Sequence, residues 1–132
     1  KRNQIIYSSK DINEVLNCSL LLDLSGKSNK DLQELVQIFS YSNLDSGNIS
    51  LLKIGEIEQS KLEIFNESLL TSIKNLNTLI TSDLLKAMKF SNKQILLISN
   101  SIENKRLIVQ IQNKLDLQSN NVLGWILIDG KL

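Results

Sequence analysis

The chain has 132 residues, of which 42 % are hydrophobic, and its 15 basic and 14 acidic residues give a net charge of +1. This length suffices for one domain with a packed core and is short for two. The balanced net charge gives no electrostatic basis for binding nucleic acid or an anionic membrane surface. Because the sequence contains no histidine, Ser-His-Asp triads, Cys-His pairs and the common zinc sites are excluded.

Cys18 is the only cysteine, so an intrachain disulfide is impossible and a reducing compartment is expected. We interpret Cys18 as a small, buried, apolar residue. No apolar run reaches the roughly 18 residues of a membrane-spanning helix, and no signal peptide is recognisable. Because the chain begins at Lys1 without a methionine, we expect it to be a fragment of a longer protein.

The first part of the chain alternates between helical and strand patterns. Ser8 and Asp11 have the spacing of a capping box before a short helix. Residues 19–24 (SLLLDL) form the continuous apolar run of a buried strand. A helix capped by Ser28 is then predicted to end near Tyr41, before a polar loop.

Residues 48–80 form the stretch on which the other predictions depend. An apolar, β-branched run reaches Gly55 and is followed by a short polar loop. Helical spacing begins after the loop, at Phe65, Leu69, Ile73 and Leu76. Such a strand, loop and helix direct backbone N–H groups and the positive end of a helix dipole at one point, where a phosphate can bind.

Three further strands are predicted in the second half of the chain, at residues 78–81, 94–99 and 122–129. The helices between them open at Asp83 and at Asn100, and Glu103 completes a capping box with Asn100. The apolar face of the second helix consists of Leu107, Ile108, Ile111 and Leu115.

The alternation of helices with continuously apolar strands favours an α/β fold. We predict a single domain over residues 1–132, a three-layer sandwich with a mostly parallel sheet of about five strands. It would be a reduced form of the P-loop NTPase-like, Rossmann-like architecture.

Gly124 lies inside the last strand, and a glycine there predicts that another segment, such as a neighbouring helix, approaches the backbone closely. Trp125 is predicted to be a core residue in preference to an exposed interface residue.

The loop after the central strand has part of the phosphate-loop pattern G-x-x-x-x-G-K-[ST]. Gly55 and Lys61 match, whereas Ser60 replaces the second glycine and Leu62 replaces the hydroxyl that would bind Mg²⁺. A capping box formed by Ser60 and Glu63 explains the same residues more simply. The sequence therefore predicts a phosphate-loop scaffold from which the chemistry has been removed.

With these elements in place, the chain resembles the family that joins bacterial polysaccharide chain-length regulators to bacterial tyrosine autokinases. Residues 8–24 are similar to the segment after the second membrane helix of that family, without its proline and glycine. Residues 79–83 (LITSD) stand where the family has a strand ending in D-x-D and keep only the second acid, Asp83. Residues 93–127 are similar to the family's late strand, helix and final strand. The segment that bears the Walker B acid in the kinases is missing.

The resemblance implies a non-catalytic cytoplasmic interaction domain of a membrane-anchored protein that regulates cell-surface polysaccharide biosynthesis, chain length or export. We expect no enzyme activity, because Leu62 and Thr81 replace groups that would hold metal during phosphoryl transfer. We expect neither a cofactor nor a metal. The degenerate phosphate-binding residues would be Gly55, Ser60, Lys61 and Asp83.

The same resemblance implies a location at the cytoplasmic face of the bacterial inner membrane, with the membrane reached only through segments outside this chain. The expected partners are further copies of the chain, forming a homo-oligomer, or other polysaccharide-assembly proteins. Nucleic acid is not an expected partner, in agreement with the net charge.

One alternative function is binding of a nucleotide or phosphate without turnover. Lys61 could meet an anion at the start of the central helix. The carboxylates of Glu56, Glu58 and Glu63 lie in the same loop and first turn, and they would repel it.

A second alternative is a receiver-like signalling domain in which Asp23 is the phospho-acceptor at the end of its strand. Receivers also need an upstream pair of acids to hold Mg²⁺. Only Asp11 and Glu14 lie upstream, within a predicted helix. We therefore prefer to interpret Asp23 as a strand-end residue that caps the following loop.

Overall fold

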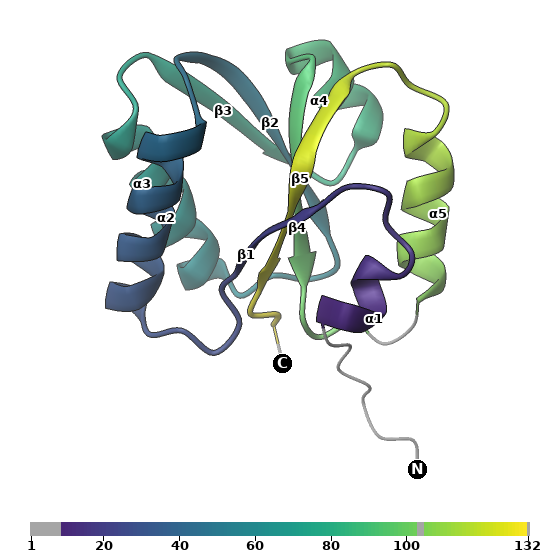
Figure 1. Cartoon of the computed structure of the whole chain (residues 1–132), viewed down its shortest axis with the longest axis horizontal. Helices are drawn as coiled ribbons and strands as arrows, with labels where there is room; N and C mark the ends of the chain where they lie inside the picture. Colours follow the sequence, from purple (N-terminus) through teal and green to yellow (C-terminus); the bar gives the residue numbers. More distant parts are fainter. Residues whose placement is uncertain (1–8, 103–104, 132) are drawn as a thin grey trace.

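A five-stranded, all-parallel sheet forms the centre of the molecule (Figure 1). The computed structural model describes residues 9–102 and 105–131. The strands lie in the spatial order β1-β5-β4-β2-β3. They are β1 (Leu20–Asp23), β2 (Gly47–Ile54), β3 (Leu76–Thr81), β4 (Lys93–Ser99) and β5 (Asn121–Ile128).

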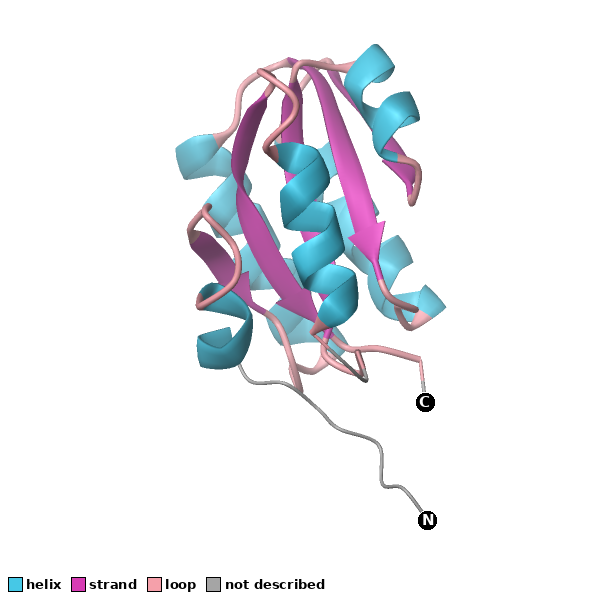
Figure 2. Cartoon of the chain, turned by 90° about the vertical axis from the view of Figure 1, so that its right-hand side faces the viewer, coloured by secondary structure: helices cyan, strands magenta, loops and turns pink. Residues whose placement is uncertain are grey.

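Helices cover both faces of the sheet, so the predicted three-layer α/β sandwich is confirmed. The helices are α1 (Ser9–Asn13), α2 (Asn29–Asn43), α3 (Gln59–Ser72), α4 (Leu84–Phe90) and α5 (Arg106–Leu115). Helices α2 and α3 lie on one face, on the left of Figure 1, and α1, α4 and α5 on the other. Figure 2 shows the second layer in front of the sheet. In the described part of the chain, no helix is both long and apolar enough to cross a bilayer.

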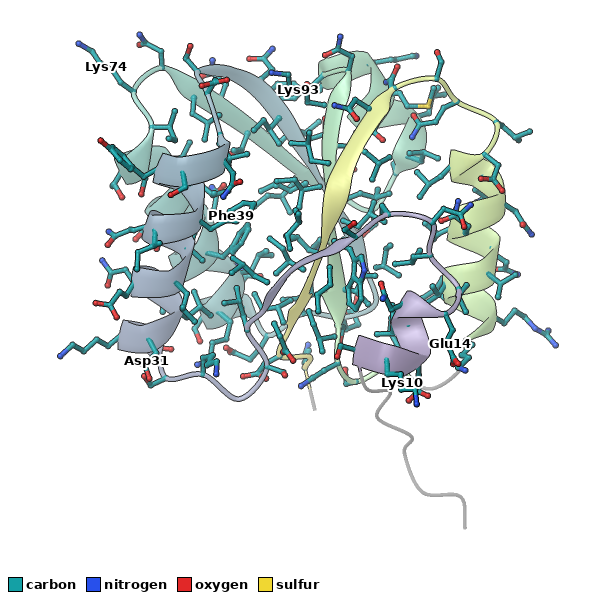
Figure 3. All side chains as sticks on the ribbon, in the orientation of Figure 1. Lys10, Glu14, Asp31, Phe39, Lys74 and Lys93 are labelled. Atoms are coloured by element: carbon teal, nitrogen blue, oxygen red, sulfur yellow. The ribbon has the colours of Figure 1, made fainter. Side chains whose placement is uncertain are left out.

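Each interior strand contributes side chains to two separate cores, as the pleat of a strand requires. On β4, Ile95 and Leu97 pack with α2 and α3, whereas Leu96 and Ile98 pack with the opposite helices. From α2, Phe39 reaches toward the sheet (Figure 3). Burial on both faces explains why the strand sequences are continuously apolar.

The local capping signals agree with the structure in some places and fail in others. Ser28 caps α2 as predicted, and its hydroxyl accepts a hydrogen bond from the backbone N–H of Asp31 at 3.2 Å. Helix α5 begins at Arg106, well after the predicted cap at Asn100, and Lys105 stands at its N-cap position. Leu107 is 38 % exposed, so its assignment to the buried face of α5 is wrong. Ser8 and Glu103, which were predicted to take part in caps, lie outside the described residues.

The central helix is shorter than its apolar spacing predicts. Helix α3 ends at Ser72 with Ile73 as its C-cap, and Asn75 takes a left-handed conformation with φ of 61°. Leu76 is buried, but as the first residue of β3 and not as part of the helix. The apolar spacing therefore continues from α3 into β3, and the turn at Asn75 is what separates the helix from the strand.

Gly124 and Trp125 join the last strand to the start of the chain. A Cβ on Gly124 would lie 2.5 Å from Leu21 Cγ and 2.6 Å from the carbonyl oxygen of Ser19. The close neighbour is therefore the segment of β1 and not a helix. Trp125 is fully buried, as predicted, and its indole N–H donates to Asn13 Oδ1 at 3.4 Å.

Gly124→Ala should lower the free energy of unfolding by about 2 to 4 kcal/mol, because the added methyl overpacks the β1–β5 contact and strains a positive φ. Gly26→Ala is the control, since nothing lies within 4 Å of its Cβ position and only its φ of +72° is strained. That change should cost about 1 kcal/mol. Urea unfolding followed by Trp125 fluorescence measures both. Equal losses would contradict the close approach of β1.

Candidate functional site

The sheet has a topological switch point between β2 and β4. These strands are neighbours, yet α3 follows β2 on one face and α5 follows β4 on the other. In open parallel sheets, ligands bind in the crevice where two such loops diverge, beyond the carboxyl ends of the strands. Figure 2 shows this edge at the bottom, where the arrowheads of the strands point. We therefore examine the crevice between the loops after β2 and β4 as the candidate site.

Gly55 and Lys61 lie where the phosphate-loop hypothesis requires them. Gly55 directly follows β2, an interior strand with β4 and β3 as neighbours, and Lys61 lies in the first turn of α3. Gly55 has a φ of +86°, and a Cβ there would lie 2.8 Å from Ile102 Cγ1 and 3.0 Å from Ser99 Cβ. Only glycine fits this position, for reasons of conformation and space that need no phosphate.

The N-terminus of α3 is already capped by a carboxylate. Glu58 accepts hydrogen bonds from the backbone N–H groups of Ser60 at 3.3 Å and Lys61 at 3.1 Å, and from the hydroxyl of Ser60. The predicted capping box of Ser60 and Glu63 is therefore wrong, and Glu63 instead accepts from Gln59 Nε2 at 3.1 Å. Glu58 uses the N–H groups that a phosphate would use at a helix start.

The charges around this helix start are also engaged. Hydrogen bonds from the side chain and backbone N–H of Ser60 lower the pKa of Glu58 below its ordinary value of 4.5, with a smaller contribution from the charge of Lys61. Glu58 is therefore anionic at neutral pH and repels another anion. The Nζ atom of Lys61 donates to the carbonyl oxygen of Lys27 at 2.6 Å, in the loop that leads to α2.

Residues 129–131, which we name the closing segment, pass over the carboxyl end of β4. The segment follows β5 and pairs with the loop that follows β2, and these two strands lie on either side of β4. The backbone N–H of Glu58 donates to the carbonyl of Asp129 at 3.0 Å, and that of Lys131 donates to the carbonyl of Glu56 at 2.9 Å. Ile57 and Gly130 form the antiparallel bridge between these two hydrogen bonds.

The inner side of the closing segment fills the crevice. Gly130 is buried, and its N–H donates to Asn100 Oδ1 at 2.8 Å. A Cβ on Gly130 would overlap the hydroxyl oxygens of Ser99 and Ser101 and lie 2.6 Å from Ser101 Cβ. Those two hydroxyl oxygens are 2.7 Å apart and hydrogen-bonded to each other. The main chain of the closing segment therefore occupies the part of the crevice that the described residues form beside the carboxyl end of β4.

The side chains of Asn100 and Asp129 fix both ends of this closure. Asn100 Nδ2 donates to Asp129 Oδ1 at 3.2 Å, so Asn100 holds the closing segment and does not cap α5 as predicted. The same Asp129 oxygen accepts from the backbone N–H of Gly26 at 2.8 Å, in the loop after β1. The closing segment therefore connects three loops at the carboxyl edge of the sheet.

Asp23 caps its own loop, as the preferred interpretation requires. Its Oδ1 accepts from the backbone N–H of Ser25 at 3.1 Å and from the Ser25 hydroxyl at 2.5 Å. Asp11 lies in α1, and Glu14 lies 3.9 Å from Lys105 Nζ on the side of the sheet that carries α5. Within the described residues, no three His, Cys, Asp or Glu side chains gather in a way that could hold a metal ion.

Asp83 lies apart from the other predicted site residues. It caps α4 and accepts from the backbone N–H groups of Leu85 at 2.9 Å and Lys86 at 3.4 Å. It lines a groove with Lys114 and Leu117, at the end of α5. The structure therefore brings Gly55, Ser60 and Lys61 together on one loop and helix start, and places Asp83 in the opposite helical layer.

Cys18 is half-buried, and not fully buried as predicted. Burial raises the pKa of its thiol, because the charged thiolate is poorly solvated there. The thiol is therefore protonated at neutral pH and a poor nucleophile.

The closing segment was not predicted from the sequence. Asp129-Gly130 directly after an apolar strand is a turn signal. The local sequence does not indicate which segment the turn pairs with. The partner residues 56–58 lie far earlier in the chain and become neighbours only through the strand order.

Comparison with models of protein families, with curated proteins and with solved structures gives no match to this chain. The assignment to the family of chain-length regulators and tyrosine autokinases stays a prediction from the sequence.

The contribution of Glu58 to stability should depend on pH. Because hydrogen bonds lower its pKa in the folded protein, the stabilisation is present above the ordinary value of 4.5 and is lost as pH falls through the folded-state pKa. The wild type should exceed Glu58→Gln in urea midpoint at neutral pH, and the difference should shrink in acid. Glu63→Gln is the control, since it removes an acid of the same helix without removing a cap. A difference that stays constant with pH would contradict the capping role.

Gly130→Ala should destabilise the protein by about 1 to 3 kcal/mol through overpacking against Ser99 and Ser101. The amide protons of Glu58 and Lys131 should lose protection from hydrogen exchange, because both donate to hydrogen bonds between the closing segment and residues 56–58. Adding Ser99→Ala and Ser101→Ala removes both overlapping hydroxyls and should restore part of the loss. The restoration should be incomplete, because the change also removes the hydrogen bonds of these hydroxyls to the backbone of Ser101 and Lys131. Unchanged protection in Gly130→Ala would show that the closing segment does not need this glycine.

Proposed function

We propose that this domain is a non-catalytic interaction domain built on a nucleotide-binding type of sheet. The observation that carries the proposal is the closure of the switch-point crevice by residues 129–131, which pair with residues 56–58. A ligand at this position would have to displace buried main chain and its hydrogen bonds. The surface that remains for recognition is the outside of the helical layers.

The residue at the metal-binding position of the phosphate-loop pattern is a core residue in this structure. Leu62, where the pattern has a hydroxyl, is 5 % exposed and belongs to the core beneath α2 and α3. Phosphoryl transfer needs cations to neutralise the charge that develops in the transition state. Lys61 lies in the first turn of α3, and its ammonium group donates to the carbonyl oxygen of Lys27. These contacts support an absence of catalysis.

For the biological setting, we propose the one that the sequence resemblance suggests. The domain would act on the cytoplasmic side of a membrane-anchored bacterial protein that regulates biosynthesis, chain length or export of a cell-surface polysaccharide. Its partners would be further copies of the chain or other polysaccharide-assembly proteins. The support is the order of elements in residues 8–24, 55–62 and 93–127, on which the resemblance rests.

A second candidate function is nucleotide or phosphate binding without turnover. It is favoured by the position of Gly55 and Lys61 at the junction of an interior strand and its helix. It would require Glu58 to leave the helix start and the closing segment to open, at the cost of the hydrogen bonds described above.

The proposal is tested by adding ATP, ADP or inorganic phosphate, each with and without Mg²⁺, to the folded protein and measuring the midpoint of thermal unfolding. We expect no shift and no hydrolysis of ATP, and Lys61→Ala should behave in the same way. A ligand at 100 times its dissociation constant would stabilise the folded state by about 2.7 kcal/mol, which is easily detected. A stabilisation by ATP that Lys61→Ala abolishes would establish the second candidate, and hydrolysis would refute both.

A further inference from the structure

The outer surfaces of the two helical layers differ in charge, although the whole chain is nearly neutral. Helices α2 and α3 together carry four acidic and two basic residues. Helices α4 and α5 carry four basic residues and no acidic residue. The two pairs of helices lie on opposite faces of the sheet (Figure 1). The α2–α3 surface, which we name the acidic side, is therefore more negative than the α4–α5 surface, which we name the basic side. Helix α1 adds Lys10 and Asp11 to the basic side, and Asp83 and Asp116 cap the ends of α4 and α5.

The basic side contains an apolar groove between α4 and the end of α5, with a volume of about 400 Å³. Its lining contains the apolar side chains of Leu84, Leu85, Met88 and Leu117, one cation, Lys114, and one carboxylate, Asp83, which caps α4. Leu85 is 57 % exposed and Leu117 is 88 % exposed. The fold does not use these two leucine side chains, and neighbouring exposed apolar groups of this size mark interaction surfaces.

The acidic side contains a second groove, between α2 and α3, with a volume of about 440 Å³. Its lining includes Ile38, Tyr41 and Thr71. Tyr41 is 84 % exposed and Ile38 is 60 % exposed. Glu34 lies four residues before Ile38, and Glu67 lies four residues before Thr71, so both carboxylates are on the adjacent turns of the same helix faces.

We propose that the α4–α5 groove of one copy binds the α2–α3 groove of a second copy, so that the chain self-associates. This inference deepens the proposed function and rests on it, since it names the partner of the interaction domain. The lysines around the first groove, Lys86, Lys89 and Lys114, form no ion pair within the described residues. Glu34 and Glu67 on a second copy supply the opposite charge, which orients the encounter and selects the partner.

The apolar side chains of the two grooves supply the binding energy. Leu85 and Leu117 on one side, and Ile38 and Tyr41 on the other, would leave water together. Large side chains at the centre of an interface, surrounded by polar groups, carry most of the affinity. An anionic membrane is a less complete partner, because it would engage the lysines and leave Ile38 and Tyr41 exposed to water.

The contact joins two different surfaces on opposite faces of the sheet, so the association is head to tail. A head-to-tail dimer keeps one unused groove of each kind, one on each copy, until a ring closes or a stack grows. Because exposed charges contribute, added salt should weaken the association.

The test uses the full chain in two variants, each broken on one side. Lys114→Glu with Leu117→Ser breaks the basic side, and Glu34→Lys with Tyr41→Ser breaks the acidic side. We expect sedimentation velocity over a dilution series to show assembly of the wild type, and about tenfold or greater weakening in each variant alone. A mixture of the two variants should form a dimer and nothing larger, because one intact groove of each kind remains.

The controls are Val109→Ser and Leu70→Ser, because both side chains are 41 % exposed and neither lines the α4–α5 groove or the α2–α3 groove. Both should assemble like the wild type. Circular dichroism and Trp125 fluorescence establish that every variant is folded. Each variant that fails to fold is replaced by its single charge reversal, Lys114→Glu or Glu34→Lys, in the same mixing experiment.

Three results would overturn the inference. The first is a monomeric wild type at every concentration, and the second is normal assembly of the acidic-side variant, which would mean that two α4–α5 grooves bind each other. The third is a monomer that sediments only with vesicles of anionic phospholipid. Stabilisation by ATP would refute the proposed function without affecting assembly, whereas a monomer that ignores ATP would refute this inference alone.

Discussion

The backbone pairing between Glu56–Glu58 and Asp129–Lys131 is the contact on which the character of this domain depends. It joins the chain after β2 to the chain after β5, across the end of the strand that separates them. Gly130 makes the pairing possible, because any side chain there would overlap the serine hydroxyls at the end of β4. The switch point of the sheet, where related architectures hold a ligand, is therefore a packed part of this molecule.

The same region gives residues typical of a phosphate loop a structural role that needs no phosphate. Gly55 has a positive φ and almost no space around its Cα, since Ile102 and Ser99 pack against it. These requirements are structural and hold whether or not an anion binds. Glu58 provides the negative charge at the start of α3 that an anion would provide elsewhere. A glycine and a lysine at the right spacing are thus compatible with a domain that binds no phosphate.

The proposed interaction depends on the distribution of charge between the two helical layers. A net charge of +1 conceals an acidic α2–α3 side and a basic α4–α5 side. Exposed leucine and tyrosine side chains lie on these same two sides. The net charge of the whole chain gives no electrostatic basis for binding a polyanion, but it says nothing about complementary surfaces on opposite faces.

The fold class, the strand positions and the cap at Ser28 followed from the sequence, because they depend on residues that are neighbours in the chain. A continuous apolar run such as residues 94–99 has few alternatives to a strand buried on both faces. The hypothesis of a phosphate-loop scaffold also put Gly55 and Lys61 at the correct junction.

Only the tertiary structure decided which cap holds α3, what Asn100 bonds to, and that Asp83 belongs to a different layer from Lys61. It also decided that the crevice is closed, since residues 56–58 meet residues 129–131 through the order of the strands. Local pattern determines the form of each element. Which residues fill the space between elements depends on packing, because packing brings together residues that are far apart in the sequence.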